Sequence, residues 1–310
     1  MTTHLYLHND KTVICLQGDN PADFLNDLLT AQIEQLEDGL ARAACLLSPQ
    51  GRILFDMLVL RKKDVIYLVT EADKADPLIK RLSLYRLRRA IEITHRPEFQ
   101  VGHLANFRQP DQIEASLLPE KAIAAIDERH PQLGWLCLIK QQDVAPGQAD
   151  TQWQKWRICN GIPEGAADLT PNRALMLEAG LDKLAAVDFK KGCYIGQEVT
   201  ARTHYRGLVK RRLFPVTAPK GKLSFGAPVK LADKIIGQCG SVASDGQTDY
   251  ALASLRLDTV QQAQKQSQQS QQSEQSEQTN NAFQLEDGTP LQLIIPGWMH
   301  PLPGFEGTEE

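Results

Sequence analysis

The segment KKGCYIGQEVTARTHYRG, residues 190–207, divides the chain into two parts of different character. Before it, stretches with the apolar spacing of helices alternate with stretches typical of strands. After Gly207 the chain consists of short β-rich runs separated by Gly, Pro and Asp, a pattern typical of a small antiparallel barrel or sandwich. We therefore expect an α+β region over residues 1–209 and a β-barrel over residues 210–310.

The first part of the chain shows the order strand, helix, strand, strand, helix, strand. Residues 11–17 are rich in Val and Ile and predict a strand, and Pro21 is well placed as the first residue of the helix that follows. Residues 41–47 and 52–61 predict a hairpin, and a second helix is expected to begin near Asp76. This order is that of a split βαβ, or ferredoxin-like, unit, so the fold class that we expect is α+β.

A Gln- and Ser-rich tract at about residues 260–281 interrupts the β-rich part. The tract lacks apolar periodicity, and such a segment buries too little apolar surface to offset the conformational entropy that is lost on folding. We therefore expect a disordered loop within the barrel, and long surface insertions of this kind cost little in loop entropy.

The composition disfavours several classes of protein and site. The net charge of -4 over 310 residues gives no overall basic field, which disfavours a generic nucleic-acid binder. The six cysteines are scattered without a CxxC pair, so neither a zinc site nor a disulfide framework is indicated, and we expect no metal ligands. The sequence also lacks the phosphate-binding glycine motifs, HExxH and GxSxG.

Three features of the sequence lead us to expect a cytoplasmic protein. Polar residues 8–11 interrupt any apolar run near the N-terminus, and Asp10, Asp19 and Asp23 supply the acidic residues that mitochondrial targeting segments avoid. No run of apolar residues reaches the length of a membrane span, so we expect no membrane partner. Scattered cysteines without a pairing pattern fit a reducing compartment.

Residues 190–202 hold the densest group of polar side chains in the chain. Apolar side chains at every fourth position predict a helix over residues 194–204. Tyr194, Glu198 and Arg202 would then form a row along one helix face, combining an aromatic ring, a carboxylate and a guanidinium. A Glu and an Arg four residues apart are also typical of a surface ion pair, and the spacing alone leaves both interpretations open.

Cys193 directly precedes this predicted helix. The partial positive charge of a helix N-terminus, together with Lys190 and Lys191, would favour the thiolate over the thiol at this position. The alternative role is that of a small buried hydrophobic side chain, which is common for a free cysteine. The composition of the segment does not decide between the two.

Asp56 and a pair of tryptophans outside this segment are also candidates for a binding or catalytic role. Asp56 stands between Phe55 and Met57 in an apolar strand, where a buried carboxylate needs a partner or a ligand, although strand alternation also permits a solvent-facing position. Trp153 and Trp156 lie three residues apart on a short predicted helix, either as core anchors or as a platform for a ligand.

Basic side chains form a cluster at the end of the segment 190–207 and directly after it. Such a cluster is either a solvated domain junction or a patch that binds an anion or RNA. Its members are Arg202, His204, Arg206, Lys210, Arg211 and Arg212.

The sequence KGCYIGQEVTAR, followed by HYRGLVKRRL, resembles the signature of the YgfZ family of folate-binding proteins, a branch of the glycine-cleavage T-protein (aminomethyltransferase) superfamily. Weaker matches lie in GDNPADFLNDLLT from Gly18, SPQGRILFDMLVL from Ser48 and WRICNGIP from Trp156. The resemblance covers most of the chain outside the Gln-rich tract, and KGCYIGQE is its most specific part.

The resemblance implies a tetrahydrofolate-binding cavity in the N-terminal region, closed by the barrel. Glu198 matches the glutamate that holds the pterin in aminomethyltransferases, where a carboxylate can accept the paired N–H donors of the amino-pyrimidine edge. Asp56 falls on the position of their catalytic aspartate, and Trp153 resembles a tryptophan that lines the folate pocket. Tyr194 and Arg202 lie on the predicted face of Glu198 and are assigned to the same ligand.

The resemblance also implies a role in the assembly or repair of iron-sulfur clusters, including those of radical enzymes that modify tRNA. Cys193 is the hallmark of the YgfZ branch and is not part of the aminomethyltransferase pattern, so we hypothesise redox or transient iron-sulfur or persulfide chemistry at this thiol. A lone cysteine cannot hold a cluster that needs several thiolates, so a client protein, an assembly protein or a small thiol would complete the site.

Two other functions stay open. A true aminomethyltransferase would act on a lipoyl carrier protein, although the branch-specific cysteine element disfavours it. An RNA-binding module would use the basic cluster between Arg202 and Arg212, although tRNA contact is not favoured over a solvated junction. The sequence does not indicate whether the protein self-associates.

Overall fold

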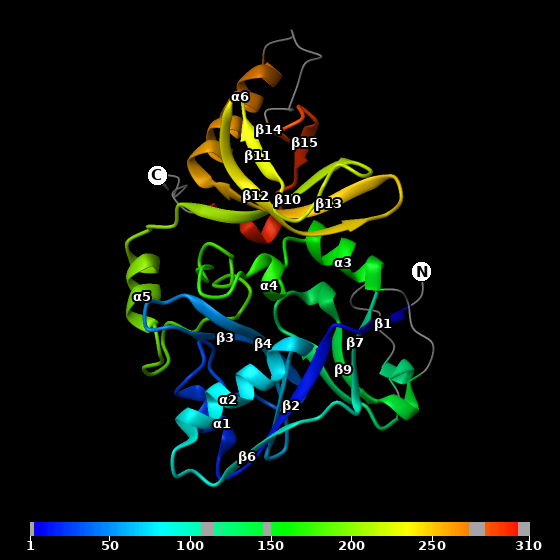
Figure 1. Cartoon of the computed structure of the whole chain (residues 1–310), viewed down its shortest axis with the longest axis vertical. Coiled ribbons are helices and arrows are strands. Elements are labelled where there is room, and N and C mark those ends of the chain that lie inside the picture. The colour runs from blue at the N-terminus through cyan, green and yellow to red at the C-terminus, as the bar shows by residue number, and fades with distance from the viewer. Residues whose placement is uncertain (1–2, 107–114, 119, 145–149, 273–282, 303–310) are drawn as a thin grey trace. The chain divides into compact units, whose positions relative to one another are not determined.

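The computed structural model describes residues 3–106, 115–118, 120–144, 150–272 and 283–302 of the chain (Figure 1). The chain divides into two compact units, each with its own sheet and its own hydrophobic core. The first unit comprises residues 1–150, 171–174 and 181–199, and the second comprises residues 151–170, 175–180 and 200–310. Segments before residue 210 that we expected in the α+β region therefore group with the barrel.

A nine-stranded sheet forms the framework of the first unit. Its strands are β1 (His4–His8), β2 (Lys11–Gly18), β3 (Leu40–Leu47), β4 (Ile53–Lys62), β5 (Val65–Glu71), β6 (Ile91–His95), β7 (Phe99–Ala105), β8 (Ile123–Asp127) and β9 (Trp135–Lys140). The order across the sheet is β1-β7-β9-β8-β3-β4-β5-β2-β6. Strands β3 and β8 run parallel, and the other neighbouring strands are antiparallel.

Two helices, α1 (Pro21–Asn26) and α2 (Ala75–Arg86), share a hydrophobic core with strands of this sheet. The first helix begins where the sequence predicts, because Asn20 accepts a hydrogen bond from the backbone N–H of Asp23 and Pro21 occupies the first turn. Leu78 and Leu82 lie four residues apart on α2, so both side chains face this core and are fully buried. The hairpin of β3 and β4 also forms as predicted.

A closed antiparallel barrel forms the second unit. Its strands are β10 (Arg211–Pro219), β11 (Pro228–Leu231), β12 (Lys234–Ser244), β13 (Thr248–Arg256), β14 (Phe283–Gln284) and β15 (Pro290–Leu293), and they close in the order β10-β13-β12-β11-β14-β15. The other α-helices of the described residues are α3 (Asp150–Cys159), α4 (Gly165–Asp168), α5 (Gln197–Tyr205) and α6 (Leu257–Gln272). The predicted fold class, α+β followed by an antiparallel barrel, is confirmed.

The second unit also contains α3 and the chain segment that follows it. Gly161 adopts φ +71, a backbone conformation that favours glycine, and a Cβ there would lie 2.4 Å from Cε of Met299. Beside it, Nε1–H of Trp298 donates a hydrogen bond to the carbonyl of Asn160 at 2.7 Å. The WRICNGIP sequence therefore packs against a segment that lies after the last barrel strand.

The Gln-rich tract is helical over its first half, so the expectation of a disordered loop is wrong for these residues. Helix α6 runs from Leu257 to Gln272, while residues 273–282 lie outside the described part of the chain. Leu257, Val260 and Ala263 are buried in the barrel core, so a short apolar stripe fixes the start of the helix. Glutamine is a good helix former and extends it.

Among the described residues, no helix combines the length and the apolar character that crossing a membrane requires.

Candidate functional site

The chain segment that leads to Cys193 is held against the first unit by hydrogen bonds. The backbone N–H of Asp188 donates to the carbonyl of Thr30 at 3.0 Å, and the Thr30 hydroxyl donates to the carbonyl of Ala186 at 2.7 Å. The Asp188 carboxylate then accepts the backbone N–H groups of Lys190 and Lys191, which closes a turn. Hydrogen bonds of residues 186–191 therefore fix the backbone that leads into Gly192 and Cys193.

Lys191 fixes the next step of the segment. Its side chain is buried, and its ammonium donates to three backbone carbonyls, those of Asn26 at 2.6 Å, Leu29 at 2.7 Å and Ala31 at 2.8 Å. Burial lowers the pKa of Lys191 to about 8, so the amine is still protonated at neutral pH and uses all three of its N–H donors. We expected Lys191 to polarise Cys193, whereas these donors are directed to the backbone between α1 and β3.

Tyr194 is buried on the other side of Cys193. Its ring lies 5.4 Å from the Lys191 ammonium in a cation–π contact, and its hydroxyl is buried with no hydrogen-bond partner among the described residues. Burial, with smaller contributions from the charges of Asp188 and Cys45, raises the pKa of Tyr194 to about 12. The side chain therefore acts as a neutral, largely apolar anchor.

The predicted helix over residues 194–204 begins later than expected. Gly196 adopts φ +81, and a Cβ at this position would lie 2.5 Å from the carbonyl oxygen of Ser48. This left-handed residue prevents a helix from starting at Tyr194, and α5 starts at Gln197. Tyr194 is therefore not in a helical row with Glu198 and Arg202, and Cys193 is not at a helix N-terminus.

Cys193 is the exposed cysteine of the six, since Cys159 is partly buried and the other four are buried. Burial, aided by the charge of Asp56, raises the pKa of Cys45 well above its usual value. Burial also raises the pKa of Cys137 to about 12 and that of Cys239 to about 11, so these thiols stay protonated. A partner or reagent in solution can therefore reach Cys193 in preference to them.

Glu198 and Arg202 are both exposed on α5. Glu198 lies in the first turn, where a carboxylate interacts favourably with the helix dipole. The same helix exposes apolar side chains, with Val199 39% and Tyr205 71% exposed. In the first unit, Glu198 and Val199 place a carboxylate and an apolar side chain close to Cys193 in sequence, whereas Arg202 and Tyr205 belong to the second unit.

Asp56 is partly buried on β4 and pairs in register with Cys45 of β3. The charge of its carboxylate adds to burial in raising the pKa of Cys45, so Asp56 pairs with a residue whose buried thiol stays neutral.

Trp153 belongs to the second unit, where its side chain is 0% exposed. Its ring lies 5.9 Å from that of Trp156, with the planes tilted by 33°. This position corresponds to a core anchor, the first of the two roles that the sequence left open.

Of the basic cluster between Arg202 and Arg212, the last two arginines form hydrogen bonds within the second unit. Arg212 is 1% exposed and donates to the carbonyl of Leu177, while Arg211 donates to Ser254 and to the carbonyl of Ile236. These two guanidinium groups stabilise the barrel and are not available to an RNA ligand. The exposed basic side chains that remain are Arg202, His204, Arg206 and Lys210.

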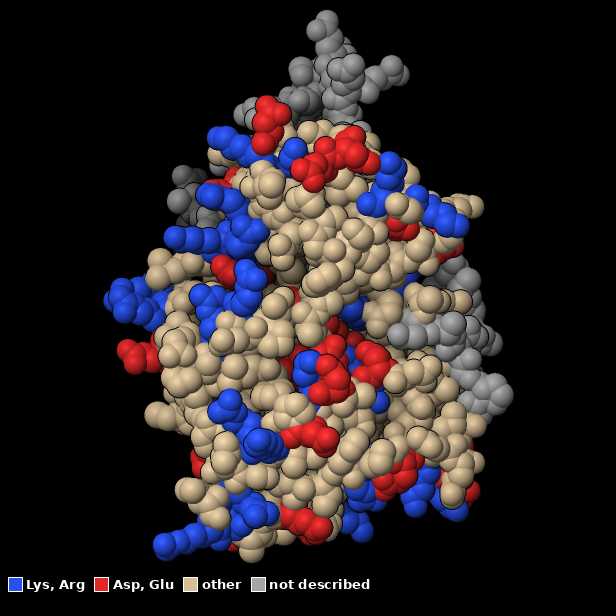
Figure 2. Space-filling model, in the orientation of Figure 1, with Lys and Arg blue, Asp and Glu red and all other residues tan. Residues whose placement is uncertain are grey.

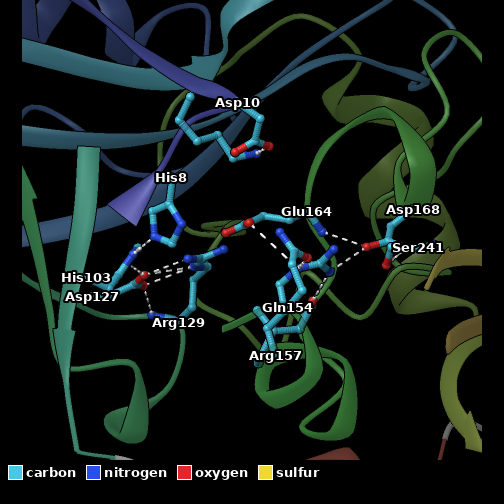
Figure 3. A network of polar contacts seen from close by, with 12 residues as sticks. His8, Asp10, His103, Asp127, Arg129, Gln154, Arg157, Glu164, Asp168 and Ser241 are labelled. Atoms are coloured by element: carbon cyan, nitrogen blue, oxygen red, sulfur yellow. Dashed lines mark hydrogen bonds and ion pairs between the residues drawn. The ribbon is translucent and has the colours of Figure 1, made fainter. Parts of the chain in front are cut away.

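A buried polar network in the first unit is not predicted from the sequence (Figure 3). Nε2 of His103 lies 3.1 Å from the Asp127 carboxylate, and Nδ1 of His103 lies 2.8 Å from Nε2 of His8. Burial lowers the pKa of His103 to about 4, against the opposing effect of Asp127, so the ring is neutral. Burial alone would raise the pKa of Asp127, but the charge of Arg129 and hydrogen bonds from His103 and Arg129 lower it to about 2.

A second network lies within the second unit (Figure 3). The buried Asp168 accepts hydrogen bonds from the Arg157 guanidinium at 2.8 Å, from the backbone N–H of Glu164 at 3.1 Å, and from both the backbone N–H and the hydroxyl of Ser241. It therefore joins α3, α4 and β12 of the second unit. The WRICNGIP motif contains Arg157, which is the one sequence signal for this network.

The described residues contain no group of three or more His, Cys, Asp or Glu side chains that could hold a metal ion. A cluster that reached Cys193 would need ligands from another molecule.

Comparison with known proteins places this geometry in context. Residues 210–301 match the family model described as the CAF17 C-terminal beta-barrel domain. The chain is similar to the mitochondrial iron-sulfur cluster assembly factor IBA57 of Homo sapiens, with 34% identity over 271 residues that cover 79% of this chain and 75% of the relative. It is 33% identical to the Mus musculus protein of the same name, over 81% of this chain and 77% of the relative.

The fold is similar to that of the glycine cleavage system aminomethyltransferase T from Bartonella henselae. The TM-score is 0.69 at 15% identity, over 96% of this chain and 87% of that structure. The aminomethyltransferase fold that the sequence resembles is therefore confirmed.

Both sequence relatives are mitochondrial by name, so the expectation of a cytoplasmic protein is wrong. That expectation depended on acidic residues among the first 23, but these residues belong to folded elements and to the turns between them, whose composition does not report the compartment. The sequence similarity extends over both units of the fold. The chain belongs to the family of the iron-sulfur cluster assembly factor IBA57.

Proposed function

We propose that this protein supports the assembly or repair of iron-sulfur clusters in client enzymes, with Cys193 as the thiol that engages the cluster or its sulfur. The exposed position of Cys193 between two buried anchors, Lys191 and Tyr194, is the observation that carries the proposal. The names of the sequence relatives support the same chemistry.

Anchoring on both sides of Cys193 serves this role. The ammonium of Lys191 and the ring of Tyr194 fix the backbone, while Gly192 and Cys193 are exposed between them. A thiolate held in this way approaches a partner at little cost in conformational entropy. The cluster is the cargo of the reaction, and the partner protein supplies its remaining ligands.

The first test measures the contact with such a partner. We expect the reduced protein to form a complex with an iron-sulfur scaffold protein that carries a [2Fe–2S] cluster. The complex is detected by gel filtration, in which both proteins and the visible absorption of the cluster elute together. Cys193→Ser is expected to lower the affinity at least about tenfold, because one thiolate ligand is lost. Cys159→Ser is the matched control, since Cys159 is partly buried on α3, and wild-type affinity in Cys193→Ser would contradict the proposal.

Tetrahydrofolate is the second ligand that we propose, with Glu198 as the pterin contact and Asp56 as the group next to the one-carbon unit. The accessible carboxylate of Glu198 can accept paired N–H donors, which supports this assignment. Trp153 does not fit the role that we assigned to it, because its fully buried ring contacts Trp156 and has no face open to a ligand. We therefore assign no chemical step to the folate.

Equilibrium titration with tetrahydrofolate tests this second ligand. We expect saturable binding to the wild type and at least about tenfold weaker binding to Glu198→Gln, because the neutral amide loses a charge-assisted pair of hydrogen bonds. Arg202→Gln, on the same helix, would report whether the guanidinium takes part. Absence of binding to the wild type would reject folate and leave the cluster proposal standing.

The client enzymes that we propose include those that modify tRNA. This part of the proposal concerns the destination of the cluster and does not require contact with RNA. The barrel hydrogen bonds of Arg211 and Arg212 support that separation, because they leave fewer basic groups for a nucleic acid.

A further inference from the structure

The end of α2 carries a surface of unusual composition, which we name the α2 patch and which consists of Lys80, Arg81, Leu84, Tyr85, Leu87 and Arg88. The sequence from residue 77 to residue 91 contains no acidic residue. The side chains of Leu84 and Leu87 are 65% and 85% exposed, among the most exposed large apolar groups of the described chain. Figure 2 shows Lys and Arg side chains gathered over α2 and its end, low in the view.

Part of the positive charge here has a structural explanation. Arg86 donates to the carbonyl of Ile91 at 2.9 Å, and Arg89 forms ion pairs with Asp23 and Asp27. Cations near a helix C-terminus also interact favourably with its dipole. Lys80, Arg81 and Arg88 are exposed, and none of the described residues forms an ion pair or side-chain hydrogen bond with them.

Leu87 is placed against its own backbone preference. It ends α2 with φ 50 and ψ -112, a conformation that suits glycine and strains a residue with a Cβ. Glycine reaches this region of backbone conformation without a Cβ penalty. A leucine at this position costs backbone strain and also exposes an apolar side chain to water, so folding of the chain alone does not explain it.

The basic side chains surround a hollow in this surface. A cavity of about 710 Å³ is lined by Tyr85, Arg86, Leu87, Arg88 and Arg89, with Asp19 as the acidic member. Guanidinium groups bind phosphate oxygens in pairs, and they do so better than ammonium groups. An anionic phosphate group beside an aliphatic phase would match both halves of the patch, the arginines and the leucines.

We infer that the α2 patch docks on the surface of a bilayer that contains anionic phospholipid. Headgroup phosphates would pair with Arg81 and Arg88, while Leu84 and Leu87 would enter the boundary of the acyl region. This combination favours a lipid surface over RNA, because aliphatic side chains gain nothing from a phosphodiester backbone and do not stack on bases. Association of this kind needs no spanning helix, and it does not depend on the function proposed above.

Sedimentation with large vesicles tests the inference on the full-length protein. We expect the wild type to sediment with vesicles of phosphatidylcholine mixed with phosphatidylglycerol and to stay in solution with phosphatidylcholine alone. High salt is expected to weaken the binding. The double variant Arg81→Glu/Arg88→Glu is expected to bind at least about tenfold more weakly, because the electrostatic attraction is reversed at two positions.

Leu87→Gly separates docking from folding. It removes the strain at φ 50, so its midpoint of thermal unfolding is expected to equal or exceed that of the wild type, while vesicle binding falls several-fold. The control variant Lys220→Glu/Phe225→Ser changes one exposed basic and one exposed apolar side chain of the second unit, where Phe225 is 66% exposed. It is expected to bind vesicles like the wild type.

Three results would overturn the inference. The first is equal or absent sedimentation of the wild type with both kinds of vesicle. The second is unchanged vesicle binding by Leu87→Gly, which would mean that the exposed apolar side chain does not contribute and that charge alone accounts for the binding. The third is binding of a single-stranded RNA oligonucleotide that Arg81→Glu/Arg88→Glu abolishes and Leu87→Gly does not, which would identify the patch as a nucleic-acid site.

Discussion

Asp168→Ala is expected to lower the free energy of unfolding of the barrel-containing unit by about 3–5 kcal/mol, because it leaves the buried Arg157 guanidinium with only the longer ion pair to Glu164, at 3.9 Å. The same change removes the acceptor of three further hydrogen bonds, from Glu164 and from the backbone and hydroxyl of Ser241. Urea unfolding, followed by far-UV circular dichroism, measures the loss.

Asp245→Ala is the matched control for this prediction. Asp245 also pairs with a basic residue of α3, Lys155 at 2.6 Å, but the pair lies at the surface, so solvent screens it. We expect a clearly smaller shift of the urea midpoint than for Asp168→Ala. Equal shifts of the urea midpoint in the two variants would mean that the buried Arg157–Asp168 pair contributes no more to stability than the exposed pair does.

Lys191→Met is expected to cost about 3 kcal/mol of stability, because three backbone carbonyls, two of them in buried hydrogen bonds, lose a charged donor that methionine cannot replace. The chain around Cys193 would lose one of its two anchors. Hydrogen exchange of residues 188–196 is therefore expected to rise, and complex formation with the cluster-carrying scaffold is expected to weaken although the thiol is intact.

Lys190→Met provides the comparison within the same dipeptide. Lys190 is exposed, and its contact to Asp188 is made by the backbone N–H, which the substitution retains. We expect stability within about 0.5 kcal/mol of the wild type. If both lysine variants behaved alike, the carbonyl contacts of Lys191 would not be what holds the segment.

The elements that the sequence predicts well are those with local signals. Pro21 and its Asn20 cap begin α1, and the hairpin of β3 and β4 follows from apolar runs on either side of a Pro- and Gly-containing turn. Strand β1 is not predicted, because its short sequence lacks the alternation of apolar and polar residues that indicates a strand. One of its buried positions is His8, a polar side chain that lies beside His103.

The candidate site is less predictable because its geometry depends on contacts between distant residues. The helix after Cys193 starts late because Gly196 lies against the carbonyl of Ser48, more than 140 positions away in the sequence. The role of Lys191 is set by carbonyls at residues 26–31, which no spacing rule relates to it. A sequence motif is enough to select Cys193 as a candidate. Its exposure to solvent depends on the contacts of Gly196 and Lys191 with distant residues, which the sequence does not show.

The tract after residue 257 shows the reverse case, where composition misled. Its Gln and Ser content is typical of disorder, yet three apolar side chains at helical spacing reach the barrel core and start α6. When hydrophobicity is averaged over the whole tract, the signal of these three side chains is lost.

The activity of iron-sulfur enzymes in cells that lack this protein tests the central claim most directly. Cells complemented with the wild type or with Cys159→Ser are expected to regain the activity, whereas cells with Cys193→Ser at equal protein levels are not. Full restoration by Cys193→Ser would show that the exposed thiol is not the functional group and would contradict the account.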